Sequence, residues 1–381
     1  FYMSKPFRLS LKVSLIGILV SVFILFFLGM LVLFAIKSPI GIRHTANRVI
    51  KEISRGVDSE VGNLFNPIDR HLQLTQSMVS SGYFSEHVMS DKFWEDYSYR
   101  VLKNLPSARM VYFVLPNKHF IISRRQADGT ESTEVIASAS GKDNSTITYR
   151  NGQGGVVRTE HKSTHFNVAL RPWYQATMTA KKAVWSAPYV FETGQELGIT
   201  RSIPIKIKKS TLIMGVDITL KDLSKFVATM SQHEQMIVMM LNRKGDLLAY
   251  PDMGKLVGGS AANKGVSFKQ LKRVWVKDAF KKYQLSPQHL VEGESGGVEY
   301  LANFSSIPGF DHKNWLVGTV ATVKGLVGNQ KERLIESMFW VLGMMLVCVF
   351  VFCFFVNRFS QRIMNLEGEM RRLSMMDFSH T

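Results

Sequence analysis

The sequence predicts an α+β protein in which a long N-terminal helix and two similar sheet-containing modules lie between two membrane helices. Two uncharged apolar stretches, residues 13–36 and 337–357, delimit the middle of the 381-residue chain. Between them, apolar residues first recur with the period of a helix and then form hairpins of strands that begin about 126 residues apart.

Both apolar stretches are long enough to cross a membrane. At a rise of 1.5 Å per residue, each spans the roughly 30 Å of a hydrocarbon core. The first stretch could alternatively be a signal peptide, because basic residues precede it. Its apolar run of 24 residues exceeds the usual length of such a segment, and no small-x-small cleavage motif follows it. We therefore expect a retained anchor.

Basic residues flank both predicted spans on the same side of the membrane. Residues 1–12 contain three of them and residues 358–381 contain four arginines. By the positive-inside rule both segments are cytoplasmic and residues 37–336 lie outside, so the chain passes twice through the lipid bilayer. Both cysteines, Cys348 and Cys353, lie in the second stretch, and the 300-residue outer part is expected to fold without a disulfide.

The formal net charge is +17, and the clearest basic cluster is residues 268–283. Phe268, Leu271, Trp275 and Ala279 form one helical stripe there with lysines elsewhere, which is typical of a solvated helix face. The outside location argues against a nucleic-acid partner. Contact with anionic lipid or an envelope polymer is the alternative.

A helix over residues 37–84 is expected to continue the first span outward as a spine. Its apolar positions recur every three or four residues, at Ile50, Ile53, Val57, Val61, Leu64, Ile68 and Leu72. Pro67 is expected to kink this helix or to mark a break, because proline lacks the backbone N–H that a helix interior uses.

Residues 85–230 and 231–336 are expected to form a membrane-distal and a membrane-proximal module. Each contains an early strand–turn–strand pattern, at residues 109–123 and 235–250. Later strands are expected at residues 187–191, 198–206, 212–217, 298–305 and 315–321, and helices at residues 220–230 and 323–336.

Residues 358–381 carry a helical seam. Ile363, Leu366, Met370 and Leu373 are spaced by 3, 4 and 3 residues, which is the a/d rhythm of a helix that packs against a second copy. A parallel homodimer is therefore expected.

This layout resembles bacterial transmembrane receptors in which an extracytoplasmic double Cache domain, made of two tandem PAS-like modules, precedes a HAMP linker. The likeness covers nearly the whole chain, and its most specific residues are RPWY at 171–174, WSAPYV at 185–190 and LIMGVDITLKDLS at 212–224. The resemblance implies a place in the bacterial inner membrane and a small-molecule pocket in the distal module. It also implies that residues 358–381 begin the HAMP linker, with Arg362 where a proline is usual.

The resemblance further implies which residues line the pocket. One subset of double Cache domains binds amino acids through a tyrosine, an arginine five residues later, a Trp-Tyr pair, a later tyrosine and an aspartate. The matching residues here are Arg171, Trp173, Tyr174, Tyr189 and Asp217. Phe166 replaces the first tyrosine, which helps to hold the ligand carboxylate in that subset. The expectation is therefore a small-ligand sensor and not an amino-acid sensor in particular.

The chemistry of these side chains suits an amine, an amino acid or a carboxylate-like ligand. Arg171 can engage a carboxylate with two parallel hydrogen bonds, and Asp217 offers the charge that an ammonium group needs. The three aromatic side chains would form apolar walls with polar tips and could stack on a cation. The alternative is that Arg171 and Asp217 pair with each other while the aromatics belong to the core. No cofactor and no metal are expected.

Three short motifs are typical of other functions. GESGG at 293–297 would make Ser295 the nucleophile of a membrane-anchored hydrolase, but no histidine or acid segment matches its partners, and a glycine-rich turn explains it better. His161 and His165 would share a zinc ion only on a helix, whereas their region has the pattern of loop and strand. GQGG at 152–155 lacks the strand-to-helix context of a phosphate loop and is expected to be a turn.

The sequence thus predicts the sensory part of a signal-transduction receptor, without catalytic residues in these 381 residues. The final stretch MRRLSMMDFS, at 370–379, looks most like the linker before an adenylate or guanylate cyclase, which implies a nucleotide cyclase as the output domain. The alternatives are a methyl-accepting chemotaxis receptor, a sensor histidine kinase and, from another class, the hydrolase.

Overall fold

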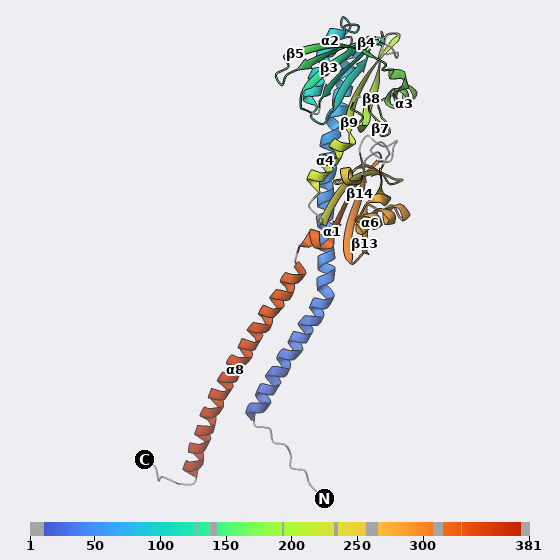
Figure 1. Cartoon of the computed structure of the whole chain (residues 1–381). Coiled ribbons are helices and arrows are strands. Elements are labelled where there is room, and N and C mark those ends of the chain that lie inside the picture. Colours follow the sequence, from blue (N-terminus) through green and yellow to red (C-terminus); the bar gives the residue numbers. More distant parts are fainter. Residues whose placement is uncertain are drawn as a thin grey trace. The chain divides into compact units, whose positions relative to one another are not determined.

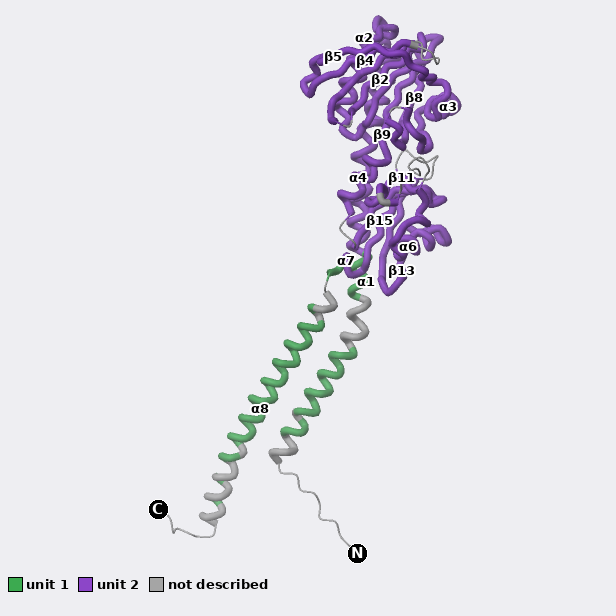
Figure 2. The backbone as a smooth tube through the Cα atoms, in the orientation of Figure 1, with its two compact units in different colours: residues 1–47, 327–381 green, residues 48–326 purple. Residues whose placement is uncertain are grey.

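The computed structural model describes residues 11–126, 128–137, 143–192, 194–231, 235–256, 266–307, 315–328 and 330–374. The chain divides into two compact units, one of residues 48–326 and the other of residues 1–47 together with 327–381 (Figure 2).

The unit of residues 1–47 and 327–381 is helical where it is described. Helix α1 (Leu11–Ser80) begins in it, and α8 (Gln330–Ser374) lies wholly within it. In α8, residues Ile335–Phe359 are long and apolar enough to cross a membrane, with a mean hydropathy of 2.8. The apolar segment of α1 is shorter, Ile16–Val32. One candidate span, the second of the two predicted from the sequence, is therefore present among the described residues, and the first span remains a prediction.

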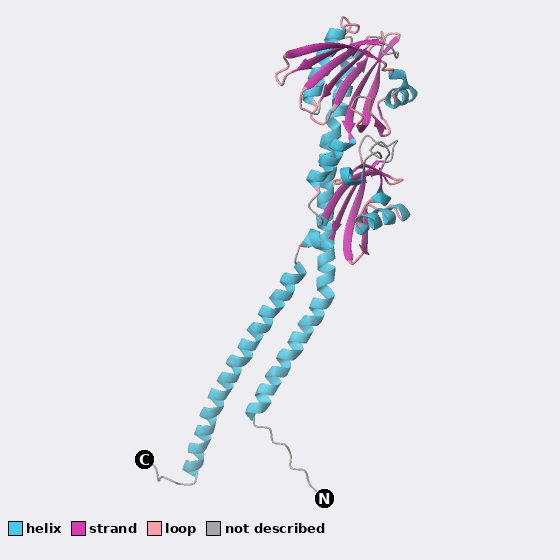
Figure 3. Cartoon of the chain, viewed as in Figure 1, coloured by secondary structure: helices cyan, strands magenta, loops and turns pink. Residues whose placement is uncertain are grey.

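The unit of residues 48–326 contains two antiparallel sheets with α1 alongside (Figures 1 and 3). The apolar stripe of α1 predicted from the sequence is buried against them, with Ile50, Val61 and Ile68 fully inaccessible to solvent. The helix is continuous through Pro67, so of the two predicted alternatives the break is wrong, and the kink stays a prediction. The buried neighbours Phe65 and Ile68 hold this turn in the core, which offsets the hydrogen bond that proline cannot make.

The first sheet has nine strands and follows α2 (Asp91–Asn104). Its strands are β1 (Met110–Val114), β2 (Phe120–Arg125), β3 (Glu131–Ile136), β4 (Asp143–Arg150), β5 (Val156–Thr164), β6 (Val184–Trp185), β7 (Tyr189–Val190), β8 (Leu197–Ile207) and β9 (Ser210–Thr219). They lie in the order β5-β4-β3-β2-β1-β9-β8-β6, and β7 pairs with β8. Helices η1 (Val168–Leu170) and α3 (Pro172–Ala180) interrupt the strands between β5 and β6.

The second sheet has six strands in the order β12-β11-β10-β15-β14-β13 and is joined to the first by α4 (Leu220–Met230). Its strands are β10 (Met236–Asn242), β11 (Asp246–Ala249), β12 (Val266–Ser267), β13 (Leu290–Ser295), β14 (Val298–Ser306) and β15 (Trp315–Thr322). Its helices are α5 (Met253–Leu256), η4 (Phe268–Gln270), α6 (Val274–Leu285) and α7 (Val323–Val327).

The two sheets share a strand order at their centres. In the first, the opening strand β1 lies between its hairpin partner β2 and the last strand β9. In the second, β10 lies in the same way between β11 and the last strand β15. The repeated hairpin pattern of the sequence thus corresponds to two sheets with a common central topology.

Both sheets are fastened to α1 by a carboxylate of that helix. Arg201 Nε of β8 lies 2.6 Å from Asp69 Oδ1, and the Ser305 hydroxyl of β14 donates a hydrogen bond to Asp58 Oδ1. The two aspartates are eleven residues apart, about three helical turns, so they lie on the same side of α1.

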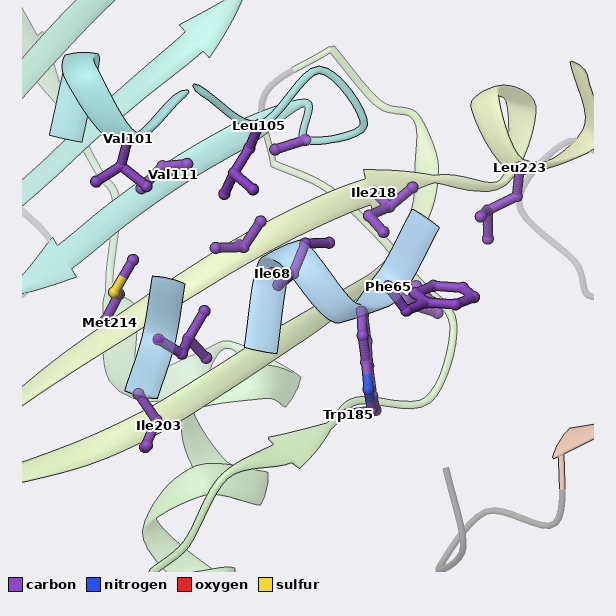
Figure 4. Close-up of a cluster of buried hydrophobic side chains, with 14 of the residues drawn as sticks. Phe65, Ile68, Val101, Leu105, Val111, Trp185, Ile203, Met214, Ile218 and Leu223 are labelled. Atoms are coloured by element: carbon purple, nitrogen blue, oxygen red, sulfur yellow. The ribbon is translucent and has the colours of Figure 1, made fainter. Parts of the chain in front are cut away.

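The core between α1 and the first sheet explains why the strands that pack on α1 could be predicted from the sequence. Phe65 and Ile68 of α1 lie among Trp185, Met214 and Ile218 (Figure 4), and the rings of Phe65 and Trp185 meet edge to face at 5.3 Å. Such burial requires long apolar runs, which make the predicted element recognisable.

Helix α4 has the predicted bounds because its cap is unambiguous: the Thr219 hydroxyl accepts a hydrogen bond from the Asp222 amide. In the basic segment 268–283 the α-helix starts only at Val274, after the short η4 turn. The predicted stripe there is buried. The helix expected over residues 323–336 is interrupted, since α7 ends at Val327 and Gly328 has a φ of 61°.

Candidate ligand site

A cavity of about 180 Å³ lies on one face of the first sheet. Three cations, three carboxylates and several aromatic and aliphatic side chains line it: Met110, Tyr112, Phe120, Ile122, Arg124, Glu134, Ile136, Lys162, Thr164, Phe166, Arg171, Trp173, Tyr189, Phe191, Glu192 and Asp217. Pockets for drug-sized molecules measure about 300–1,000 Å³, so this cavity suits a smaller ligand.

The alternation of strand residues places this cavity on the face of the sheet opposite α1. Val111 and Phe113 of β1 belong to the core cluster that contains the α1 side chains. Met110 and Tyr112 point the other way and line the cavity. Ligand contacts on one face and helix contacts on the other therefore come from neighbouring residues of the same strand.

The RPWY stretch places its arginine at the start of α3. Pro172 occupies the first helical position, where its missing N–H is not needed, and Arg171 before it is extended, with φ −79° and ψ 134°. Arg171 makes no side-chain cap to the helix, which leaves its guanidinium for other partners. Trp173 is buried and its ring lies 4.6 Å from that of Tyr112.

Gly215 in the GVD stretch makes room for Tyr112. Tyr112 lies directly opposite Gly215 in the β1–β9 register, and a Cβ at Gly215 would come within 2.2 Å of the tyrosine ring. The ring therefore lies across β9, and its hydroxyl donates to Asp217 Oδ1 at 2.9 Å. Val216, which lies between Gly215 and Asp217 in β9, points to the α1 side of the sheet, where it is fully buried.

A chain of hydroxyl groups ends at Asp217. The Thr200 hydroxyl donates to Asp217 Oδ1 at 2.6 Å, and the Tyr189 hydroxyl lies 2.7 Å from Thr200 Oγ1. Since Thr200 has one proton and gives it to Asp217, Tyr189 must donate to Thr200. Burial raises the pKa of Tyr189 and Tyr112 well above the usual value, so both remain protonated donors.

Asp217 itself is almost completely buried. Burial raises the pKa of its carboxyl to about 7, while hydrogen bonds from Thr200 and Tyr112 and the charge of Arg171 oppose the increase. The charged and neutral forms are thus present in similar amounts near neutral pH. A carboxyl in this state responds strongly to a cation that enters the cavity.

Arg171 has partners other than Asp217. Its Nη1 lies 2.7 Å from Glu192 Oε2, and its Nη2 donates to the Val190 carbonyl at 3.2 Å. Its guanidinium carbon is 5.9 Å from the centre of the Tyr189 ring. The Glu192 side chain is 59% exposed, so water weakens this ion pair.

The structure brings together four of the five residues that the resemblance implied. Arg171, Trp173, Tyr189 and Asp217 all line the cavity. Tyr174 is not among the lining residues and instead contacts the Trp173 ring edge to face at 5.7 Å.

Phe166, which replaces the tyrosine of the amino-acid-binding subset, lines the cavity and stacks on Phe120 at 4.7 Å. Sequence reasoning did not find Tyr112, Thr200 or Glu192. These residues reach the site only through the pairing of strands, which no local sequence motif indicates.

The motifs of other functions have structural explanations. Ser295 ends β13, pairs with Val298 and precedes Gly296 and Gly297, whose φ angles of 62° and 73° form the two-residue turn of a hairpin. The GQGG stretch closes the turn between β4 and β5, where the Asn151 amide donates to the Gly155 carbonyl at 3.0 Å. His161 lies in β5 beside Thr146. Among the described residues, no group of three or more histidine, cysteine or acidic side chains could hold a metal ion.

Ligand-binding domains of chemoreceptors are among the solved structures that this chain resembles. The domain of Campylobacter jejuni Tlp3 in complex with L-norvaline has a TM-score of 0.47 at 13% identity, over 75% of this chain and 94% of that one. The domain of Pseudomonas aeruginosa PctB in complex with L-Gln has a TM-score of 0.45 at 15% identity, over 77% and 98%. At these values the similarities say nothing about the ligand of this chain.

Two sequence comparisons concern the part of the chain that forms the first sheet. The methyl-accepting chemotaxis protein McpG of Pseudomonas putida is 27% identical over 160 residues, which are 40% of this chain and 22% of that protein. The chain thus spans about a fifth of the length of this relative. Residues 101–225 match the family model of the first PDC sensor domain of methyl-accepting chemotaxis-like proteins. This segment runs from α2 to α4, so the part of the chain around the cavity is similar to a sensor domain of the chemoreceptor type.

Proposed function

We propose that this chain is the sensory, membrane-anchored part of a bacterial signal-transduction receptor, and that the cavity of the first sheet binds a small amine or zwitterion. The observation that carries this proposal is Asp217, a buried carboxyl in the cavity wall with a pKa of about 7. Burial deprives its charged form of water, and an ammonium group would replace that lost stabilisation.

The surrounding side chains supply the rest of a cation site. The rings of Tyr112, Trp173 and Tyr189 line the cavity close to Asp217 and could stack on the ligand. Arg171 would hold a ligand carboxylate in place of Glu192, whose exposed side chain is easily displaced. This arrangement favours a ligand that carries both an ammonium group and a carboxylate over one that carries a carboxylate alone.

Binding by the 381-residue chain in lipid nanodiscs tests the proposal. A panel of L-amino acids, alkylamines and monocarboxylates is screened by thermal shift, and the hits are measured by calorimetry. Asp217→Asn should weaken every amine-containing ligand by at least tenfold, and Arg171→Gln should weaken those with a carboxylate. Asp128→Asn and Arg158→Gln, outside the cavity lining, are the matched controls. Unchanged affinity in Asp217→Asn would overturn the proposed site.

The proposal includes two membrane spans with residues 37–336 outside the bacterial inner membrane. The apolar segment Ile335–Phe359 supports the second span, and the sequence pattern of residues 13–36 supports the first. In a variant with Cys348→Ser and Cys353→Ser, a cysteine at Asp128 should react with a membrane-impermeant maleimide in spheroplasts, and one at Lys5 should not. Equal labelling of both positions would exclude this topology.

We propose a chemotaxis-type output reached through a HAMP-type linker at residues 358–381. The match of residues 101–225 and the relative in Pseudomonas putida support this output, whereas the cyclase expectation has no support beyond the sequence of residues 370–379. In the native host, ligand should change the methylation of a chemotaxis-type receptor. A change in the concentration of a cyclic nucleotide, with constant receptor methylation, would favour the cyclase instead.

A further inference from the structure

A cluster of charged side chains lines the cavity away from Asp217. It consists of Arg124 of β2, Glu134 of β3 and Lys162 of β5. Arg124 forms an ion pair with Glu134 Oε2, and Lys162 Nζ lies 3.6 Å from Glu134 Oε1. The side chains of Arg124 and Glu134 are 8% and 5% exposed, whereas that of Lys162 is 51% exposed. We call these three residues the second cluster.

The second cluster has one positive charge in excess. One carboxylate faces two cations, and the Arg124 Nε is a buried polar atom without a hydrogen-bond partner among the described residues. A buried donor of a charged group that lacks an acceptor loses its hydration without compensation, which is unfavourable. An anionic group in the cavity would supply the missing acceptor and balance the charge.

The strand register fixes how far this cluster lies from Asp217. Asp217 of β9 is opposite Met110 of β1, which in turn is opposite Arg124 of β2. Two strand spacings separate the aspartate from the arginine, which is about 10 Å between Cα atoms. Since both side chains line the cavity, a ligand that contacts both must carry its ammonium and anionic groups at opposite ends.

The wall between the two charged ends is apolar. Met110 lies opposite both Asp217 and Arg124 in the strand register, and Ile122, Ile136 and Phe120 are further apolar residues of the lining. A short methylene chain would fit against these side chains, whereas a polar group there would lose its hydration.

We propose that the second cluster is a subsite for an anionic group on the ligand's tail, so that the receptor prefers small amines with an acidic side chain. This inference rests on the proposed function, in which Asp217 takes the ammonium group. A dicarboxylate without an amine would place a negative charge near Asp217 and bind poorly. A purely structural second cluster would stabilise the sheet and would not distinguish among ligands.

Three L-amino acids with matched skeletons test the inference. Glutamate and norvaline have the same carbon chain up to Cδ, where glutamate carries a carboxylate, and glutamine carries a neutral amide. Calorimetry on the 381-residue chain in nanodiscs should show that glutamate binds at least tenfold more tightly than norvaline, with glutamine between them. Equal affinity for glutamate and norvaline would overturn the inference, and so would binding by none of the three.

Variants separate the subsite from a structural role. Lys162→Gln changes a half-exposed side chain and should weaken glutamate about fivefold while norvaline changes less than twofold. Glu134→Gln removes the competing carboxylate and should strengthen glutamate only. Arg158→Gln removes a positive charge from the same strand outside the cavity lining and is the control. Melting temperatures verify that each variant is folded.

The outcomes distinguish this inference from the proposed function. If Asp217→Asn weakens all three amino acids while Lys162→Gln and Glu134→Gln change none of them selectively, the amine site stands and the acidic-tail subsite is wrong. If Asp217→Asn has no effect, the proposed function itself fails.

Discussion

At the scale of single residues, Asp217 combines burial with a place in the cavity wall. Its hydroxyl partners, Thr200 and Tyr112, donate to the same carboxylate oxygen, Oδ1. These hydrogen bonds favour the charged form, yet burial outweighs them and raises the carboxyl pKa to about 7. The charge of the site is therefore set by whatever enters the cavity.

Ligand affinity should depend on pH through this carboxyl. With a pKa of about 7, roughly a tenth of Asp217 is charged at pH 6 and nine tenths at pH 8. An ammonium ligand binds the charged form, so its Kd should fall about tenfold as pH rises from 6 to 8, and binding should release close to one proton at pH 6 and few protons at pH 8. Calorimetry at pH 6, 7 and 8 measures this. Asp217→Asn should show a flat profile, and a flat profile in the unaltered chain would contradict the prediction.

Gly215 should tolerate no side chain. In Gly215→Ala the new Cβ would displace the Tyr112 ring, which removes the hydrogen bond to Asp217 and overpacks the core at a cost of about 1–3 kcal/mol. We expect a lower melting temperature and at least tenfold weaker amine binding. Gly56→Ala is the control, because a Cβ there meets no atom within 4 Å and alanine favours a helix. Equal behaviour of the two variants would show that Tyr112 can move without loss.

At the scale of elements, β8 connects the cavity to the long helix. Thr200 points toward Asp217, and the next residue, Arg201, points to the other face and pairs with Asp69 of α1. Because neighbouring residues of a strand alternate in direction, any shift of β8 on ligand binding is applied to α1 through this ion pair. The same strand thus contacts both the proposed site and the spine.

The pair of Arg201 and Asp69 should be energetically coupled. Both side chains are mostly shielded, with 12% and 27% exposure, so Arg201→Gln and Asp69→Asn should each lower the stability by about 1–3 kcal/mol. The double variant should cost less than the sum of the two. The melting temperatures of the unaltered chain, the two single variants and the double variant, measured in nanodiscs, form a double-mutant cycle. Strict additivity would mean that the contact does not link β8 to α1.

Strands that pack on α1 were predictable, whereas the outer strands were not. Strands β8 and β9 carry the long apolar runs that such burial needs. Strand β5 is exposed along almost its whole length, and β3 buries serine, threonine and glutamate, so neither has an apolar pattern. The second cluster escaped prediction for the same reason, since only strand pairing brings its members together.

The residues of the site also divide into those that could be predicted from the sequence and those that could not. Arg171, Trp173, Tyr189 and Asp217 could be named because a family resemblance supplied their spacing. Their actual partners could not, because Arg171 meets Glu192 instead of Asp217. Hydrogen bonds between strands distant in sequence leave no local signature.

At the scale of the whole molecule, two sheets of common central topology share one helix. Arg201 and Ser305 attach them to Asp69 and Asp58, respectively. The proposed receptor would act as a dimer whose cytoplasmic helices meet along the seam of residues 363–373.

Cross-linking tests this dimer. In a chain without its two native cysteines, Leu366→Cys and Met370→Cys should form disulfide dimers in membranes under mild oxidation, because both occupy the predicted seam. Gly368→Cys, which lies about 180° from the centre of this seam around the helix axis, should cross-link far less. Equal yields at all three positions would contradict a parallel pairing along this seam.

The spacing of Asp58 and Asp69 along α1 fixes the angle around the helix axis at which each sheet attaches. Each residue of a helix turns the chain by about 100° and advances it by 1.5 Å. One extra residue between the two aspartates would therefore leave only one sheet able to meet its anchor, whereas eleven extra residues would restore the angle while separating the sheets by about 16 Å. Insertions and deletions in this stretch of homologous chains should change its length by about 7 or 11 residues, which restore the angle to within about 20°, and hybrid receptors that exchange either sheet should keep the intervening helix at its native length.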